Sequence, residues 1–192
     1  MHSAGASATP TDPHLRGLLD RSAEIVADTE RLASSLSEEQ LLWKPAPETW
    51  SVAQCFDHLI TTNLHYFPGV RRAIDEGRAR GRRARGAFRH SFLGAQLLKV
   101  VGPRVRARLR APAIFKPSAA PPPTIYRDFL LQQRTLDEMI RDADGLDLRR
   151  IKVASPVTRL LRFGLGDALE IMIAHEMRHL RQAEAVSAAT SR

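Results

Sequence analysis

The fold of this chain is decided near its C-terminal end, where the sequence reads Ala174-His175-Glu176-Met177-Arg178-His179-Leu180. Two histidines four positions apart lie on one face of a helix, with β-carbons roughly 5–6 Å apart. Apolar residues before and after them recur every three or four positions, which predicts a helix that turns both imidazoles toward the core. A shared metal ion would satisfy both buried rings, and hydrogen bonds to neighbouring helices are the alternative.

The composition is that of one globular domain. The chain has 192 residues, 43% of them hydrophobic, which suits a single domain with a substantial core. The single cysteine, Cys55, excludes an intramolecular disulfide and favours a reducing compartment. No apolar run approaches the ~20 residues of a transmembrane helix. The residues up to Pro13 lack the apolar core of a signal peptide, so the cytoplasm is the expected location.

The formal net charge of +8 comes from one segment. Between Arg71 and Arg110, thirteen Lys and Arg residues accompany only Asp75 and Glu76. Such a segment can attract anionic substrates, bind nucleic acid or an anionic membrane, or remain a solvated loop. It lacks the interleaved aromatic residues and the motifs of proteins that read nucleic acid, so nucleic acid is disfavoured as a partner.

Four apolar stripes of helical periodicity predict an all-α fold, a four-helix bundle. Ser51 is expected to cap the second helix and Gly77 to end it, while Asp167 is expected to cap the fourth. The four predicted helices span residues 13–36, 51–76, 124–144 and 167–186.

The connections between these helices are unequal. Residues 78–123 are rich in arginine and broken by glycine and proline, with one short amphipathic helix predicted over residues 92–101. We interpret this segment as a long basic crossover between the second and third helices, which would then be parallel. Residues 151–153 are expected to be briefly extended, and residues 1–12 and 187–192 to be flexible tails around a single domain at 13–186.

Two histidines do not complete a metal site, so a third ligand is needed. A zinc metalloprotease would take it from downstream and use Glu176 as general base. Only thirteen residues follow His179, and the metzincin continuation is absent, which disfavours that interpretation. Upstream, His58 is the best candidate because it lies in the middle of the second helix beside its apolar face. His65 is two turns further on, too far to share the ion, although it can line the same cavity.

These motifs together resemble the DinB-like superfamily. The resemblance covers residues 13–186 and rests on Trp43-Lys44-Pro45-Ala46-Pro47, Trp50-Ser51, Asp57-His58-Leu59 and residues 175–182. Members are up-down-down-up bundles, often dimeric, and many hold a divalent metal on one histidine of the second helix and two of the fourth. The resemblance therefore implies a homodimer and the metal ligands His58, His175 and His179. Characterised relatives include thiol S-transferases and a maleylpyruvate isomerase that uses low-molecular-weight thiols, while other members are described as metal-dependent hydrolases without characterisation.

The expected function is that of a metal-dependent enzyme, a thiol S-transferase or a hydrolase acting on a small electrophilic substrate. An ion held by three neutral imidazoles keeps its positive charge, which favours ionisation of a bound water or thiol. Imidazole ligands suit zinc, nickel, iron and copper alike, and a low-molecular-weight thiol is a candidate co-substrate. The alternative is a non-enzymatic stress-response or binding module, in which the metal is structural or absent and the basic segment meets a partner.

The sequence assigns no catalytic residue, but Glu176 and Arg178 are candidates for a supporting role. Glu176 can act as a base or orient a ligand, yet it faces about 100° away from His175, which favours a solvated side chain or a pair with Arg178. Arg178 and Gln182 can orient a substrate anion or a metal ligand, or serve the surface. Cys55 is expected to be a core residue.

The two tryptophans, Trp43 and Trp50, stand on either side of the second helix's start signal. Both are expected to be packing residues, and a role as substrate platforms is the less favoured interpretation.

Overall fold

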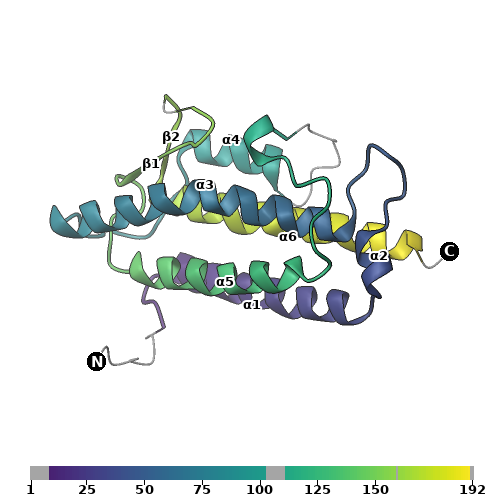
Figure 1. Ribbon diagram of the computed structural model, residues 1–192. Helices are drawn as coiled ribbons and strands as arrows, with labels where there is room; N and C mark the ends of the chain where they lie inside the picture. The colour runs from purple at the N-terminus through teal and green to yellow at the C-terminus, as the bar shows by residue number, and fades with distance from the viewer. Residues whose placement is uncertain (1–8, 103–110, 159, 191–192) are drawn as a thin grey trace, which may run out of the picture.

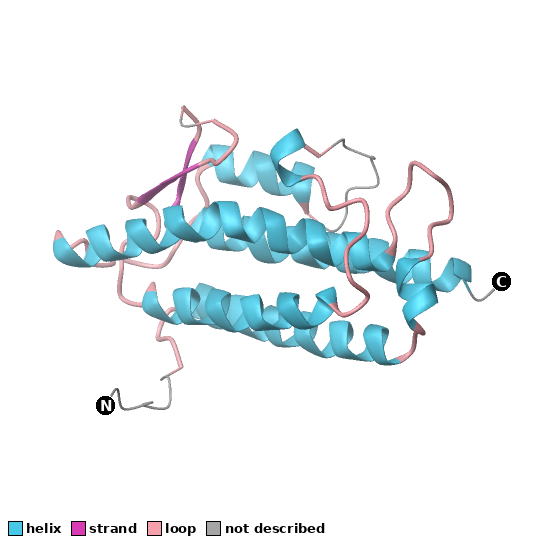
Figure 2. Ribbon diagram, viewed as in Figure 1, coloured by secondary structure: helices cyan, strands magenta, loops and turns pink. Residues whose placement is uncertain are grey.

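The chain is mostly helical. The computed structural model describes residues 9–102, 111–158 and 160–190. Its helices are α1 (Pro13–Ser34), α2 (Glu38–Leu42), α3 (Val52–Ala79), α4 (Phe92–Val101), the 3₁₀ turn η1 (Ala113–Phe115), α5 (Ile125–Asp142) and α6 (Leu165–Thr190). Two short strands, β1 (Lys152–Ala154) and β2 (Arg162–Gly164), pair antiparallel (Figure 2). The sequence predicted the extended conformation near β1 but not its partner strand.

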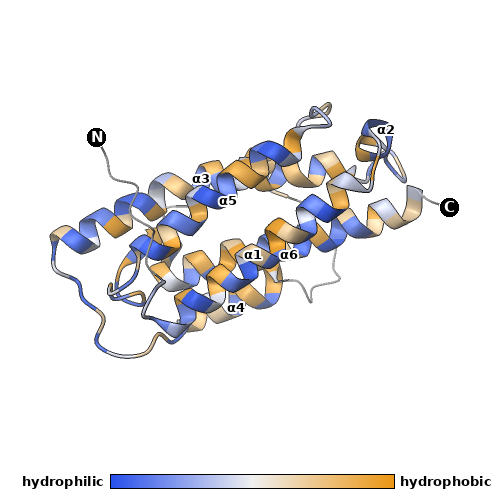
Figure 3. Ribbon diagram, turned by 90° about the horizontal axis from the view of Figure 1, so that it is seen from below, coloured by the Kyte–Doolittle hydropathy of each residue, from blue (hydrophilic) through white to orange (hydrophobic). Residues whose placement is uncertain are grey.

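Four long helices, α1, α3, α5 and α6, pack side by side around one core (Figure 1). The helix α3 contacts both α5 and α6, and α1 contacts the same two helices. Their shared interior is built from fully buried large side chains, among them Phe56 of α3, Phe129 of α5 and Leu18 of α1. Apolar and polar residues alternate along each helix in Figure 3, as expected when one face of a helix is buried.

The helix α3 begins as predicted and ends later. Ser51 and Gln54 form a capping box, in which each side chain accepts a hydrogen bond from the other residue's backbone. The helix continues past Pro68 and Gly77 to Ala79. Gly77 therefore lies inside the helix and does not end it. A β-carbon at this position would lie 2.5 Å from the Ile151 side chain, so the glycine allows a close approach between the helix and Ile151.

The predicted N-cap of the fourth helix is wrong. The helix α6 starts at Leu165, directly after β2, which places Asp167 within its first turn. The Asp167 side chain is fully buried and accepts hydrogen bonds from His90 Nδ1 at 2.8 Å and from Ser91 Oγ at 2.7 Å. It therefore fastens the start of α4 to α6 instead of capping its own helix.

The described parts of the segment between α3 and α5 lie against the long helices. The predicted short helix over residues 92–101 is confirmed as α4, which packs on α6, while η1 packs on α3. Residues 103–110 lie outside the described residues, as do residues 1–8 and 191–192 of the predicted tails at 1–12 and 187–192, whereas residues 187–190 belong to the helix α6. Residues 9–12 do contact the domain, through hydrogen bonds of Thr11 and Asp12 to Asp144.

The predicted absence of a membrane span holds for the described helices. Each of them is too short or too polar to cross a bilayer.

Candidate metal centre

The three histidines that the resemblance implied lie together between α3 and α6. His58 comes from the second turn of α3, and His175 and His179 come from successive turns of α6. One ring nitrogen from each lies within 4.8 Å of the other two. The Nε2 atoms of His58 and His175 are 3.3 Å apart.

The spacing of these nitrogens fits one metal ion. Zinc binds imidazole nitrogen at about 2.1 Å, so two such ligands at a tetrahedral angle stand about 3.4 Å apart. The 3.3 Å separation of the His58 and His175 Nε2 atoms is close to that value. The hydrogen-bonded alternative uses the same atoms, because the Nε2 atoms of His58 and His175 are also close enough for one ring to donate to the other between α3 and α6.

Two of the rings are oriented by acceptors at Nδ1. The His58 Nδ1–H donates to the backbone carbonyl of Phe115 in η1 at 2.6 Å, since a carbonyl oxygen can only accept. His179 Nδ1 lies 3.0 Å from Oε1 of Gln182, one turn further along α6. Protons held at Nδ1 leave both Nε2 atoms with free lone pairs, which is the tautomer that metal ligation requires.

Burial keeps the triad neutral. It lowers the pKa of His58 below its usual value, lowers that of His175 well below it, and lowers that of His179 to about 3. The neighbouring imidazoles and the Arg178 guanidinium lower the pKa of His175 and His179 further, because each disfavours another positive charge. A neutral imidazole is the form that binds a metal.

Trp50 forms a wall of this centre. Its ring lies 4.7 Å from the His58 ring and 5.7 Å from the His179 ring, between centroids. The sequence predicted Trp50 as a packing residue, and the structure shows that it packs on two of the three histidines. Trp43, by contrast, is exposed.

Glu176 does not lie in solvent, so the favoured sequence interpretation is wrong. Its side chain is fully buried, and Oε1 accepts a hydrogen bond of 2.9 Å from Asn63 of α3. Burial raises the pKa of Glu176 to about 8. The two buried oxygens Glu176 Oε2 and Gln133 Oε1 have no donor among the described residues, and a proton on Glu176 supplies one.

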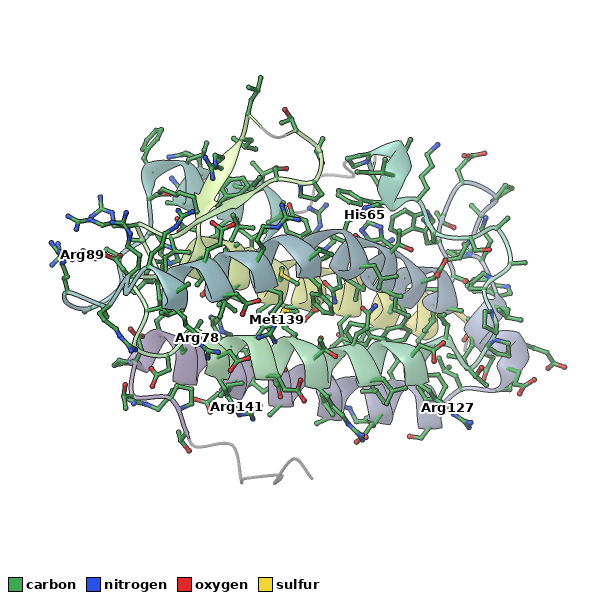
Figure 4. All side chains as sticks on the ribbon, turned by 60° about the vertical axis from the view of Figure 1, so that its left-hand side comes forward. His65, Arg78, Arg89, Arg127, Met139 and Arg141 are labelled. Atoms are coloured by element: carbon green, nitrogen blue, oxygen red, sulfur yellow. The ribbon has the colours of Figure 1, made fainter. Side chains whose placement is uncertain are left out.

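The remaining candidates take other positions. Arg178 donates to the carbonyl oxygen of Val100 at the end of α4. His65 is exposed and lies against the Phe115 ring on the crossover side of α3 (Figure 4). Cys55 is fully buried, and burial raises its thiol pKa to about 12, which fits the predicted core role and leaves almost no thiolate at neutral pH.

The sequence carried no clear signal for one part of this centre. Phe115, which orients His58, lies fifty-seven positions away in an irregular segment. Gln182, by contrast, was a candidate to orient a ligand, and its position three residues after His179 on the same helix brings it to that ring.

Of the comparisons with known proteins, the one with protein families gives a match. A family model described as the DinB superfamily matches residues 23–183, which contain all three histidines. No curated protein and no solved structure matches the chain. The match covers most of the sequence, and the chain therefore belongs to the DinB superfamily.

Proposed function

We propose that this protein is a metal-dependent enzyme that binds one divalent ion through His58, His175 and His179. The observation that carries the proposal is the convergence of three neutral imidazoles, with Nδ1 of His58 and His179 held by acceptors. When bound, such an ion acts as a Lewis acid that lowers the pKa of a bound water or thiol.

A catalytic role is favoured over a structural one by the number of ligands. Among the described residues, the group of close metal-ligating side chains holds three histidines and no cysteine, aspartate or glutamate. Structural zinc sites are closed by four protein ligands, whereas catalytic sites keep a position open for water or substrate. His175 is also partly exposed, which supports access from solvent.

The proposed reaction is thiol transfer to, or hydrolysis of, a small electrophile. In both cases the protein's own residues hold the histidine ligands in place. Trp50 packs on the rings of His58 and His179, and the acceptors on Phe115 and Gln182 fix the tautomers of the same two rings. The Arg178 guanidinium contributes positive charge beside the triad, which favours an anionic substrate or nucleophile.

The proposal includes the topology of the bundle. In Figure 1, α1 and α6 run toward the end that holds α2 and the C-terminus, while α3 and α5 run the opposite way. This arrangement supports the up-down-down-up order of the family, with the crossover joining the parallel helices α3 and α5.

The first test is metal content. Protein purified without an affinity tag is expected to bind about one equivalent of divalent metal by elemental analysis. His179→Ala is expected to lose it, and His58→Ala likewise. Full metal retention by His58→Ala would remove His58 from the ligand set.

The second test is turnover. Metal-loaded protein is assayed for transfer of low-molecular-weight thiols to a chromogenic electrophile and for hydrolysis of activated esters. We expect one of these activities, removed by a chelator and by His179→Ala. Full metal occupancy without either activity would favour the alternative, a structural metal in a binding module.

A further inference from the structure

The helix α4 exposes large apolar side chains, although it lies on the outside of the long helices. Its inner face, with the buried Gly94, packs on α6. Its outer face exposes Phe92, Leu93 and Val100, and Phe92 is 81% exposed. Gln96 and Lys99 are exposed on the same side, so the outer face is mixed, and among the described residues nothing covers its apolar side chains.

The connection between β1 and β2 continues this apolar surface. The strand β2 contacts α4, and Figure 1 shows both on the same side of the α3–α6 layer. Leu160, in that connection, is 96% exposed, and Val157 is exposed as well. Exposed apolar residues scattered singly are ordinary, but here they occur on two adjoining elements.

The same region carries a cluster of arginines. Two adjoining cavities of about 400 and 200 Å³ are lined by the tip that follows α3 and by the segment before β1. Among the described residues, Asp147 and Asp12 are the only acidic ones that line them, and the sequence has no Asp or Glu between Glu76 and Asp128. The arginines lining the cavities, all exposed, are Arg80, Arg82, Arg83, Arg85, Arg89, Arg149 and Arg150.

This basic tip is held in place by backbone bonds. Arg83 pairs with Leu146 in an isolated β-bridge, and Asp147 N–H donates to the carbonyl of Arg82 at 2.9 Å. The chain then leads through Arg89 to the Asp167 contacts that fix the start of α4. This stretch of chain connects the arginines to the start of α4. The arginines that line the two cavities, together with the exposed apolar residues Phe92, Leu93, Val100, Val157 and Leu160, form one edge of the molecule.

We propose that this edge docks the protein on an anionic lipid surface. Protruding Phe92 and Leu160 side chains suit the boundary between headgroups and acyl chains, and the arginines suit anionic headgroups. A second copy of the chain would bring two like-charged clusters together, which opposes association through this edge. Duplex nucleic acid would pair with the arginines but gives exposed aliphatic side chains no apolar environment.

Vesicle binding tests the proposal. The full-length protein is sedimented with vesicles of phosphatidylcholine mixed with phosphatidylglycerol, and with vesicles of phosphatidylcholine alone. We expect binding to the anionic vesicles, weaker binding to the neutral ones, and a decrease with added salt. Failure to bind the anionic vesicles would overturn the proposal.

Two pairs of variants separate the apolar and basic contributions. Phe92→Ser with Leu160→Ser is expected to weaken binding at least about tenfold, because both side chains enter the membrane boundary. Its control is Leu64→Ser with Leu131→Ser, which removes two exposed leucines from α3 and α5. The control is expected to bind like the wild type, and an equal loss in both pairs would contradict a specific docking edge.

Arg82→Gln with Arg85→Gln is expected to weaken binding about twentyfold, since each arginine near an anionic surface contributes severalfold. Arg127→Gln with Arg134→Gln removes the same charge from α5, and Figure 4 shows Arg127 at the opposite end of the molecule from Arg89. An unchanged affinity of the Arg82/Arg85 variant would overturn the proposal.

Two further outcomes would assign the edge to another partner and overturn the lipid proposal. One is a dimer in analytical ultracentrifugation that the Phe92/Leu160 variant converts to a monomer. The other is random duplex DNA binding more tightly than anionic vesicles, with no effect of the Phe92 and Leu160 substitutions.

Discussion

At the scale of single residues, His175 and Glu176 are adjacent in the chain but lie in different surroundings. His175 faces His58, whereas Glu176 faces Asn63 among the long helices. The histidine spacing alone predicted the pairing of His175 with His179, because helical geometry fixes it. For Glu176, helical geometry gives only the angle between its side chain and that of His175. Whether the Glu176 side chain then faces solvent or another helix depends on how the helices pack, which no local pattern encodes.

Glu176→Gln is expected to change the free energy of unfolding near pH 7 by less than about 1 kcal/mol, whereas Glu176→Ala should cost about 2–3 kcal/mol. With a pKa of about 8, the Glu176 carboxyl is mostly protonated at that pH, and a neutral amide of the same shape replaces it. Denaturant unfolding measures both changes. Loss of bound metal in Glu176→Gln, at unchanged stability, would instead show that the centre requires the carboxyl group.

Gln182→Ala is expected to weaken metal binding by about tenfold or more, because the His179 ring loses the acceptor that holds its tautomer. Competition with a chelating dye measures the affinity. Gln182→Glu keeps an acceptor and should retain the affinity, while Glu184→Ala on the same helix serves as a control. Equal affinities of Gln182→Ala and the wild type would remove Gln182 from the centre.

At the scale of elements, local sequence patterns predict which segments are helical better than they predict where each helix begins and ends. The Ser51 capping box correctly placed the start of α3, because its hydrogen bonds are made within four residues. Asp167 shows the opposite case. Aspartate is a common helix-capping residue, but here its carboxylate accepts hydrogen bonds from His90 and Ser91, which lie far away in the sequence. The β1–β2 pairing was missed for a similar reason, since strands of three residues carry little periodicity.

The pair of Arg21 and Glu170 connects α1 to α6 with two hydrogen bonds, of 2.5 and 2.7 Å. Burial raises the pKa of Glu170, but the bonds from Arg21 outweigh it and hold the pKa below its usual 4.5. A lowered folded-state pKa stabilises the protein above about pH 4.5, and this stabilisation disappears as the pH falls through the folded-state value.

Glu170→Gln is therefore expected to lower the free energy of unfolding by about 1–3 kcal/mol at pH 7. The difference from the wild type should shrink as the pH falls below about 4.5, because the wild-type carboxylate is then protonated as well. Denaturant unfolding at several pH values measures this. Glu138→Gln, at an exposed position of α5, should show no such difference, and a constant deficit at all pH values would contradict the role of the ion pair.

At the scale of the whole molecule, the proposed metal centre would join two of the four long helices, so that metal binding and folding would be linked. An ion that binds only the folded state stabilises it by about 2.7 kcal/mol at a hundredfold excess over its Kd, which raises Tm by several degrees for a chain of this size. Calorimetry with and without metal measures the shift. His179→Ala should show none, and a Tm of the wild type that ignores both metal and chelator would contradict the centre.

The hydrogen bond from His58 to Phe115 gives the crossover a thermodynamic connection to the ion. The acceptor belongs to η1, so the position of the crossover decides how firmly one ligand is oriented. Coupling between two such events is reciprocal. A change that moves η1 away from α3 is expected to weaken metal binding. A bound metal is expected to oppose that movement by the same free energy. The least regular segment of the chain is thereby coupled to the proposed metal centre.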